Sequence, residues 1–180
     1  IRYTRVDPHA KTITVGGGTT WGEVDHASHV FKMATPSGII STTGVGGLTT
    51  GGGMGYLTRK FGLSIDNLLS VDMVLADGKF VTANATENQD LFWAVRGGGS
   101  NFGVVTAFTF QLHEVDNVYA GPMLYELSET EEVLKWYRKF MKYAPDDMYG
   151  FFAFLTVPPG DPFPQHLHNK KMCGIIWNYT

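Results

Sequence analysis

The feature that most constrains this chain is a run of 26 residues, from Met33 to Thr58, without a charged side chain. A run of this length raises the question of a membrane-spanning helix. It contains eight glycines and eight serines or threonines, however, and glycine is a poor residue for a helix interior. Glycine also lets main-chain N–H groups approach a ligand closely. We therefore expect buried, irregular backbone here that contacts a ligand.

Glycine is enriched in the chain as a whole, with 22 among 180 residues, which is about 12% against a usual ~7%. The glycines form four clusters, at 16–18, 44–47, 51–55 and 97–99. Successive N–H groups in such segments can hold phosphate oxygens. No cluster completes the dinucleotide-binding pattern G-x-G-x-x-G, because Thr49 and Tyr56 stand where the last glycine is needed. None continues into G-K-[ST], which excludes a P-loop.

Composition narrows the function classes further. Hydrophobic residues make up 43% and charged residues 17%, which is enough for a sizeable core. The net charge of −3 gives no basic excess, so we expect neither nucleic acid nor a membrane as partner. The single cysteine, Cys173, excludes an intrachain disulfide. The pairs His26/His29 and His166/His168 have no further ligand nearby in sequence, so no metal site is expected.

The first two thirds of the chain predict alternating strands and helices. Strands are expected over 2–6, 12–15 and 104–112, and a hairpin over 72–75 and 80–83, where Asp77-Gly78 forms the turn. A helix should begin at Thr19 or Thr20, with Glu23 in its first turn, and run to about Phe31. A second helix is expected over 88–95.

The pattern changes near Asp116. Strands are expected over 119–127, 148–157 and 172–179, with a helix from Ser128 to Ala144 between the first two. Ser128 and Glu131 form a capping-box pattern. If the strands form the floor of a second domain, four tyrosines could line a substrate cavity there: Tyr119, Tyr125, Tyr149 and Tyr179. The expected domains are therefore 1–116 and 117–180, and the expected fold class is α+β.

Three ordered motifs resemble a known family. Residues 35–55 (TPSGIISTTGVGGLTTGGGMG) resemble the flavin-binding segment of the vanillyl-alcohol oxidase and p-cresol methylhydroxylase (PCMH-type) superfamily of FAD-linked oxidoreductases, most closely its berberine-bridge-enzyme-like branch. Residues 59–67 (RKFGLSIDN) and 90–105 (DLFWAVRGGGSNFGVV) match its next two motifs. The resemblance implies the second half of a PCMH-type FAD-binding domain, followed by the start of an antiparallel-sheet substrate domain. Both ends are expected to be cut from a longer protein.

The resemblance also implies FAD as the cofactor and a set of contacting residues. The backbone from Ser41 to Gly47 would follow the flavin ring, ribityl chain and pyrophosphate, and Val104 would meet the adenine. The implied cofactor-binding residues are Pro36, Ser41, Thr42, Thr43, Gly44, Val45, Gly46, Gly47, Thr50, Gly51, Gly53, Gly103, Val104 and Val105. No catalytic residue is assigned. The catalytic base is expected beyond Thr180, and a histidine that could bind flavin covalently is expected before Ile1.

Four positions depart from the family's usual residues. Ile40 replaces the cysteine that links the flavin in part of the family, so a cysteinyl link is excluded. Leu48 stands where a histidine is common, and Met54 where a tyrosine is common. Thr43 occupies the position thought to influence oxygen access, and it is not one of the usual aliphatic residues. The sequence therefore does not decide whether the enzyme is an oxidase or a dehydrogenase.

The implied function is hydride transfer from an organic substrate to flavin, with oxygen or another acceptor reoxidising it. The substrate would be an alcohol, a sugar or a phenolic or alkaloid-like compound. The alternative is a flavin-free small-molecule or nucleotide-binding module on the same fold, which Leu48 and Met54 favour slightly. The sequence does not assign an oligomeric state or a cellular location.

Overall fold

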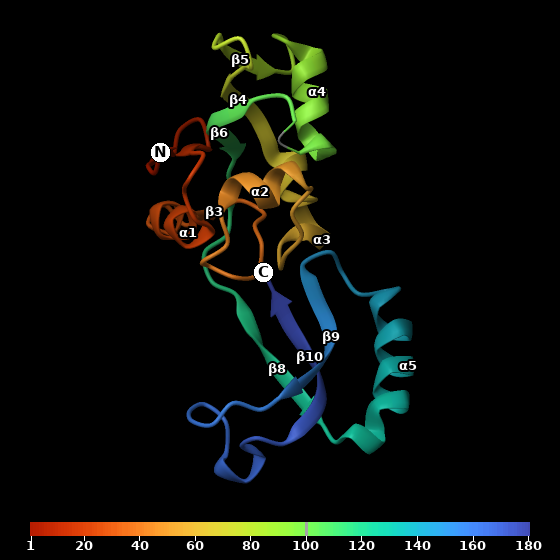
Figure 1. Ribbon diagram of the computed structural model, residues 1–180. Coiled ribbons are helices and arrows are strands. Elements are labelled where there is room, and N and C mark those ends of the chain that lie inside the picture. Colours follow the sequence, from red (N-terminus) through yellow and green to blue (C-terminus); the bar gives the residue numbers. More distant parts are fainter. Residues whose placement is uncertain (100) are drawn as a thin grey trace. The chain divides into compact units, whose positions relative to one another are not determined.

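The computed structural model describes residues 1–99 and 101–180, so Ser100 of the third motif lies outside the described residues. The described chain divides into two compact units, Ile1–Asp116 and Asn117–Thr180 (Figure 1). Each unit combines an antiparallel sheet with helices. The expected α+β fold class is therefore confirmed.

The first unit is built on a five-stranded antiparallel sheet in the order β1-β2-β6-β4-β5. Its strands are β1 (Thr4–Asp7), β2 (Thr12–Gly16), β4 (Leu68–Val74), β5 (Phe80–Asn84) and β6 (Val104–Gln111). Because side chains alternate between the faces of a strand, residues paired across strands share a face. Val15, Phe108, Val71 and Ala83 form one such row across four strands, and all four are buried.

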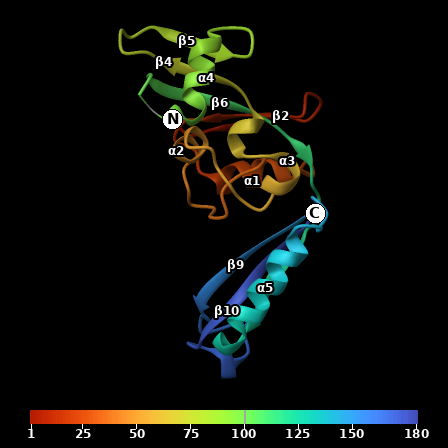
Figure 2. The same cartoon turned by 90° about the vertical axis from the view of Figure 1, so that its right-hand side faces the viewer.

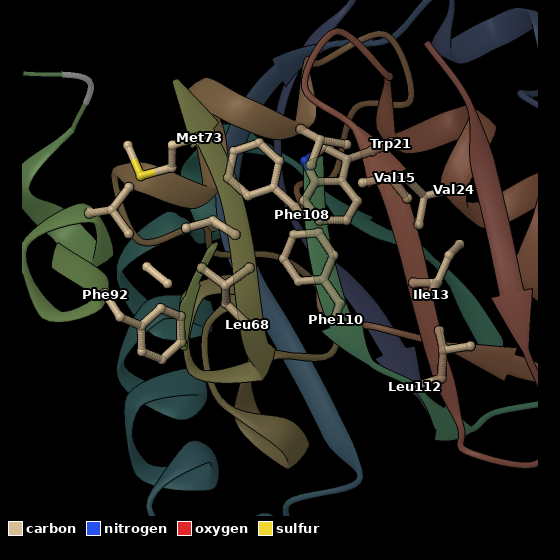
Figure 3. Packing of buried hydrophobic residues seen from close by; sticks show 14 residues of the cluster. Ile13, Val15, Trp21, Val24, Leu68, Met73, Phe92, Phe108, Phe110 and Leu112 are labelled. Atoms are coloured by element: carbon tan, nitrogen blue, oxygen red, sulfur yellow. The ribbon is translucent and has the colours of Figure 1, made fainter. Parts of the chain in front are cut away.

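Three helices cover this apolar face: α1 (Trp21–His29), α2 (Val45–Thr50) and α4 (Gln89–Gly98). Figure 3 shows Trp21 and Val24 of α1 packed toward Phe110 and its neighbours, with the rings of Trp21 and Phe110 5.5 Å apart. The predicted start of α1 is confirmed. The Thr20 backbone N–H donates to Glu23 Oε2 at 2.8 Å, which satisfies one of the donors at the helix start.

The glycine-rich run differs from the expectation of irregular backbone. Val45–Thr50 is helical, and the single turn α3 (Thr58–Phe61) and the 3-10 turn η1 (Ser64–Asn67) follow it. The Val45 N–H donates to Thr19 O at 2.9 Å, and both Val45 and Thr49 are buried. Contacts with distant residues thus impose a helix that local propensity does not favour. None of the helices in the described ranges is long and apolar enough to cross a membrane.

A second unexpected feature is the short pairing of β3 (Met33–Ala34) with β7 (His113–Glu114). The Val115 N–H also donates to Lys32 O at 3.0 Å. This two-residue ladder holds the beginning of the glycine-rich run against the chain that follows β6. Strands this short leave no alternating pattern in a sequence.

The second unit has a three-stranded antiparallel sheet in the order β8-β10-β9. Its strands are β8 (Tyr119–Tyr125), β9 (Met148–Thr156) and β10 (Lys171–Tyr179). Helix α5 (Thr130–Met141) lies along one face of this sheet (Figure 2). Trp177 of β10 contacts Trp136, Tyr137 and Phe140 of α5, with ring centroids 6.2, 6.1 and 5.7 Å away. A 3-10 turn, η3 (Gln165–Leu167), lies in the loop between β9 and β10.

The capping prediction for α5 was wrong. The chain enters the helix through the 3-10 turn η2 (Leu127–Glu129), so the reciprocal cap lies two residues earlier than expected. The Glu126 N–H donates to Glu129 Oε2 at 2.9 Å. Glu131, the expected capping partner of Ser128, instead forms an ion pair with Lys135 one turn further along. The helix also ends at Met141 rather than at Ala144.

Candidate cofactor-binding site

The loop from Ser41 to Gly44 is anchored to the start of α1. The N–H groups of Trp21 and Gly22 donate to Thr43 O and Ser41 O at 3.0 and 2.8 Å. These bonds use two of the donors that a helix leaves unpaired in its first turn. Thr42, which stands between the two anchored residues, forms no hydrogen bond with any residue that the structure describes. The loop is therefore fixed on one side and open on the other.

Helix α2 continues from this loop, and glycines lie along one side of it. A methyl group placed on Gly44 or Gly47 would meet nothing within 4 Å, and on Gly51 it would meet only carbonyl oxygens of its own helix. These three residues lie on one side of α2 because residues three and four apart are neighbours on a helix. On the opposite side, a methyl group on Gly46 would lie 3.2 Å from Gly17 O. We call the side formed by Gly44, Gly47 and Gly51 the glycine face.

The glycine face provides the test of whether the chain fits FAD. A flat ring system needs space that a Cβ atom would occupy, and Gly44 and Gly47 leave that space free. A pyrophosphate needs N–H donors, and the first N–H groups of a helix have no acceptor within the helix. Gly46 and Gly47 lie in the first turn of α2. The described residues therefore fit a flavin nucleotide at this place.

The residues predicted for the adenine end lie at the start of β6. Gly103 has φ +150°, and a methyl group there would lie 2.6 Å from Val74 O, so only glycine fits. Val104 is 69% exposed. The Gly17 N–H donates to Thr106 O at 2.9 Å, so the backbone groups of Thr106 point toward β2. Val104 pairs with Val74 of β4, beyond the end of β2.

Gly17 links the two groups of predicted residues, and the sequence prediction did not include it. It lies against Gly46 of α2 on one side, and a methyl group on it would lie 2.3 Å from Val105 O on the other. The glycine cluster 16–18 was visible in the sequence, but it indicated only the end of a strand. Its function as a close backbone junction requires knowledge of which strands pair.

The other predicted residues face the protein interior. Pro36, Val45 and Thr50 are buried, and Thr50 Oγ1 donates to Gly46 O of its own helix at 3.1 Å. A methyl group on Gly53 would meet Ser64 Oγ at 2.4 Å. These residues shape the wall behind the glycine face rather than its surface. Whether any predicted residue contacts FAD stays a prediction.

A cavity of about 710 Å³ adjoins the loop, within the usual range for ligand pockets. Its lining residues are Arg2, Tyr3, Thr4, Thr19, Thr20, Gly22, Glu23, His26, Ser41 and Thr42. Arg2 Nη2 lies 3.0 Å from Glu23 Oε2. Hydrogen bonds from the Thr20 backbone, from Arg2 and from the Thr20 hydroxyl lower the pKa of Glu23 to about 2. The charge of Arg2 is therefore balanced locally, and the cavity wall is mainly neutral.

The second motif, residues 59–67, supports the glycine-rich run through side-chain hydrogen bonds. Asn67 Nδ2 donates to the carbonyls of Phe61 and Leu63, both at 2.9 Å. Its Oδ1 lies 2.6 Å from His113 Nε2, and burial lowers the pKa of His113. With both N–H bonds of the amide used, Oδ1 is left as the acceptor, so His113 donates from Nε2. Asn67 thus ties α3 and η1 to β7.

The second unit holds a separate aromatic cavity of about 540 Å³ between α5 and its sheet, lined by residues that include Trp136, Phe140 and Trp177. The strand register places Tyr119 opposite Tyr179, and Tyr179 opposite Met148, so Tyr149 lies on the other face of the sheet. Tyr119 and Tyr179 border the cavity, whereas Tyr125 and Tyr149 do not. The assignment of residues 117–180 to a substrate domain stays a prediction. No group of three or more metal-ligating side chains occurs among residues 1–99 and 101–180.

Comparison with known proteins identifies the class. Residues 2–84 match the family model for an FAD binding domain. An FAD-linked oxidoreductase, pgmH of Aspergillus terreus, is 40% identical over 90% of this chain and 34% of its own length. An FAD-linked oxidoreductase of Dictyostelium discoideum is 44% identical over 74% of this chain and 30% of its own length. The chain thus spans about a third of the length of the relatives it matches.

Solved structures of other proteins are also similar to this chain. Phl p 4, a grass pollen allergen with glucose dehydrogenase activity, is 29% identical over 99% of this chain and 35% of its own, with a TM-score of 0.84. BBE-like 1 of Physcomitrella patens is 31% identical over 99% of this chain and 37% of its own, with a TM-score of 0.84. For 6-hydroxy-D-nicotine oxidase of Arthrobacter nicotinovorans the identity is 29% over 99% of this chain and 38% of its own, with a TM-score of 0.83.

Fold and site together define a flavoprotein domain whose cofactor is FAD. The chain is similar to FAD-linked oxidoreductases over most of its length, residues 2–84 match the FAD binding domain, and its structural relatives include a BBE-like protein. The family resemblance inferred from the three motifs is therefore confirmed.

Proposed function

We propose that this chain is the FAD-holding part of an oxidoreductase that takes a hydride from a C–H bond of an organic substrate. The observation that carries this proposal is the glycine face of α2 beside the open side of the loop Ser41–Gly44. A surface in which glycines leave the backbone uncovered suits a flat ring and a pyrophosphate better than a bulky or branched ligand. When bound, FAD supplies the hydride acceptor, and the protein supplies orientation and electrostatics.

The residues of this chain would bind and orient rather than transfer protons. The backbone around Gly46 and Gly47 offers neutral N–H donors to a doubly negative pyrophosphate. The bonds from Trp21 and Gly22 hold the loop so that this surface is formed before a ligand arrives. No described residue is assigned as the base that removes the substrate proton.

The substrate we propose is an alcohol, a sugar or a phenolic or alkaloid-like compound. The relatives support this range rather than one member of it, because Phl p 4 has glucose dehydrogenase activity and another relative is a 6-hydroxy-D-nicotine oxidase.

The electron acceptor that we propose is oxygen or another molecule. Wild-type Phl p 4 is a glucose dehydrogenase, and an isoleucine-to-valine variant of it is a glucose oxidase. One aliphatic side chain thus changes the class in that protein. Thr43, which the resemblance places near the oxygen path, is the residue we propose for this choice.

The test is a visible absorption spectrum of the intact protein that carries this chain, before and after acid precipitation. We expect a yellow protein. Colour that stays in the pellet means covalently bound flavin, and colour in the supernatant means FAD held by contacts alone. A colourless protein that takes up no added FAD contradicts the proposal and favours the flavin-free binding module.

A pair of variants locates the site. Gly47→Ala adds a methyl group where nothing lies within 4 Å, so the fold should be retained. We expect the variant to unfold at the wild-type temperature or above it, because alanine favours helices over glycine by about 1 kcal/mol. It should nevertheless hold FAD more weakly. Gly121→Ala in the second unit is the matched control, since its added methyl group also meets nothing within 4 Å. Equal FAD affinity in the two variants would place the cofactor elsewhere.

A further inference from the structure

The uncharged run from Met33 to Thr58 has both of its ends at one residue, His113 of β7. Where the run begins, Ala34 of β3 pairs with His113 in the register of the two strands. Just beyond the end of the run, the ring of Phe61 in α3 stacks on the imidazole. The two ring centroids are 4.0 Å apart, with 11° between the planes. The glycine-rich run is therefore a long excursion of the chain that closes at His113.

Asn67 connects the imidazole to the second of these ends. Its amide nitrogen donates to the carbonyls of Phe61 and Leu63, and its Oδ1 accepts from His113 Nε2 at 2.6 Å. Asn67 is only 5% exposed. Loss of the donor on His113 would therefore leave a buried acceptor unpaired, which is costly. The same bond fixes the orientation of the amide.

The 3-10 turn η1, which ends with this asparagine, is bonded to the backbone just after α2. The Ile65 N–H donates to Gly52 O at 3.0 Å, and the Ser64 N–H donates to Gly53 O at 2.9 Å. Gly52 directly follows Gly51, the last member of the glycine face. Two backbone hydrogen bonds thus join the position of η1 to the position of the glycine face.

The beginning of the run is held by the same segment. Beside the pairing of Ala34 with His113, the Val115 N–H donates to Lys32 O at 3.0 Å. Lys32 Nζ also lies 2.8 Å from Asp116 Oδ2. The segment 113–116 therefore fixes the chain on both sides of the loop Ser41–Gly44 and the glycine face.

We propose that His113 is a positioning residue for FAD: by donating to Asn67 it closes the glycine-rich run and sets the position of the glycine face. This inference rests on the proposed function. The hydrogen bond carries the effect rather than the stacking on Phe61, because only the bond orients Asn67 and, through it, η1. His113 and Asn67 therefore act on FAD as one unit.

The experiment uses the intact flavoprotein that carries this chain. His113→Phe keeps a flat ring against Phe61 and removes the donor, whereas His113→Gln keeps a donor near the place of Nε2 and removes the ring. Asn67→Leu removes the amide, and the double variant with His113→Phe tests whether His113 acts through it. Val81→Ala is the control for a loss of packing, because Val81 packs against the same core from the edge strand β5.

The readouts are the visible circular dichroism of bound flavin, the dissociation constant of FAD and the unfolding temperature of the apoprotein. Where flavin is covalently bound, the circular dichroism band replaces the dissociation constant. We expect His113→Phe to alter the flavin band and to weaken FAD binding by roughly tenfold. His113→Gln should stay close to wild type in both. The double variant should bind FAD no more weakly than Asn67→Leu alone, and Val81→Ala should lower only the unfolding temperature.

Each contrary outcome has its own meaning. A yellow wild type with an unaltered band and affinity in His113→Phe overturns this inference alone. An equal loss in His113→Gln assigns the effect to the stacked ring and also overturns it. Weaker FAD binding in the double variant than in Asn67→Leu shows that His113 acts on the cofactor directly, again contrary to the inference. A spectral change in Val81→Ala equal to that in His113→Phe reduces His113 to an ordinary packing residue. A wild-type protein that binds no FAD overturns the proposed function and this inference together.

Discussion

Helices α2 and α5 have the same backbone geometry but opposite surfaces: α5 packs side chains against a sheet, whereas α2 exposes glycines. Helix α5 has twelve residues, packs Val133 and its aromatic neighbours toward the sheet, and places charged residues outward. Helix α2 has six residues, carries no charge and offers a face of glycines. A helix that covers a sheet needs side chains and is therefore visible as a periodic pattern. A helix that presents its backbone must lack them and leaves no such pattern.

For the same reason, different interactions should stabilise the two helices. An amphipathic helix gains most of its stability from the apolar stripe that it buries. Glycine in a helix interior costs about 1 kcal/mol relative to alanine, and α2 contains two glycines. The bond from the Val45 N–H to Thr19 O and the burial of Val45 and Thr49 must offset that cost. Helix α2 is thus held by its surroundings, and changes in those surroundings test the comparison.

The largest effect is expected for Gly55→Ala. The added methyl group would lie 1.9 Å from the backbone oxygen of Ser37, so one of two braced segments must move. We expect a loss of about 3 kcal/mol, at the upper end for overpacking, measured by urea unfolding. Gly44→Ala, which adds a methyl group to the same glycine-rich run in open space, should change stability by less than about 0.5 kcal/mol. Equal losses in the two variants would show that the run tolerates no side chain at all.

Trp177→Ala tests the other half of the comparison. The indole contacts Trp136, Tyr137 and Phe140 of α5, and Gly150 leaves room for it, because a methyl group there would lie 2.5 Å from the ring. Since the ring is only half-buried, we expect a loss of about 2 kcal/mol rather than the larger cost of a fully buried tryptophan. Unfolding monitored by circular dichroism measures it.

The control for that prediction is Trp93→Ala, because Trp93 is 75% exposed. It should change stability by less than about 0.5 kcal/mol. Neither tryptophan variant should alter the spectrum of bound flavin. A larger loss in Trp93→Ala than in Trp177→Ala would mean that aromatic packing against α5 does not hold the second unit together.

The sequence predictions were correct for features that depend on nearby residues and missed features that depend on distant ones. Strands with buried alternation, such as Ile13 and Val15 on β2, were predicted correctly, and so was the start of α1, where Thr20 is one of the two expected capping residues. Both depend on residues close in sequence. Helix α2 and the junction at Gly17 were missed because they depend on which distant strands pair. Register has the same origin, and it separates Tyr149 from Tyr119 and Tyr179 although all three lie on strands.

The candidate site was predictable only in part. The three motifs indicate the cofactor and the segment that holds it, and the family comparison confirms FAD. The motifs do not distinguish residues that form the open surface from those that support it. Gly47 and Gly53 look alike in sequence, yet a methyl group on Gly47 meets nothing and one on Gly53 meets Ser64 and Leu48. That distinction requires the coordinates of segments far apart in the chain.

The smallest expected effect is a pH dependence at the start of α1, where the loop of the candidate site is anchored. The pKa of Glu23 is about 2, below its ordinary value of 4.5, because Thr20 and Arg2 hydrogen-bond its carboxylate. A carboxylate with a depressed pKa in the folded state adds stability that is complete above the unfolded-state pKa and is lost as pH falls toward the folded-state pKa.

Glu23→Gln should therefore lower the unfolding temperature slightly at pH 7, and the difference from wild type should shrink between about pH 4.5 and 2. Glu114→Gln, which removes an exposed ion pair with Lys11 that does not involve the start of α1, is the control and should have less effect on FAD binding. A Glu23→Gln deficit that stays constant across this pH range would mean that the cap acts through shape rather than charge. The anchoring of the loop would then depend on the bonds from Trp21 and Gly22 alone.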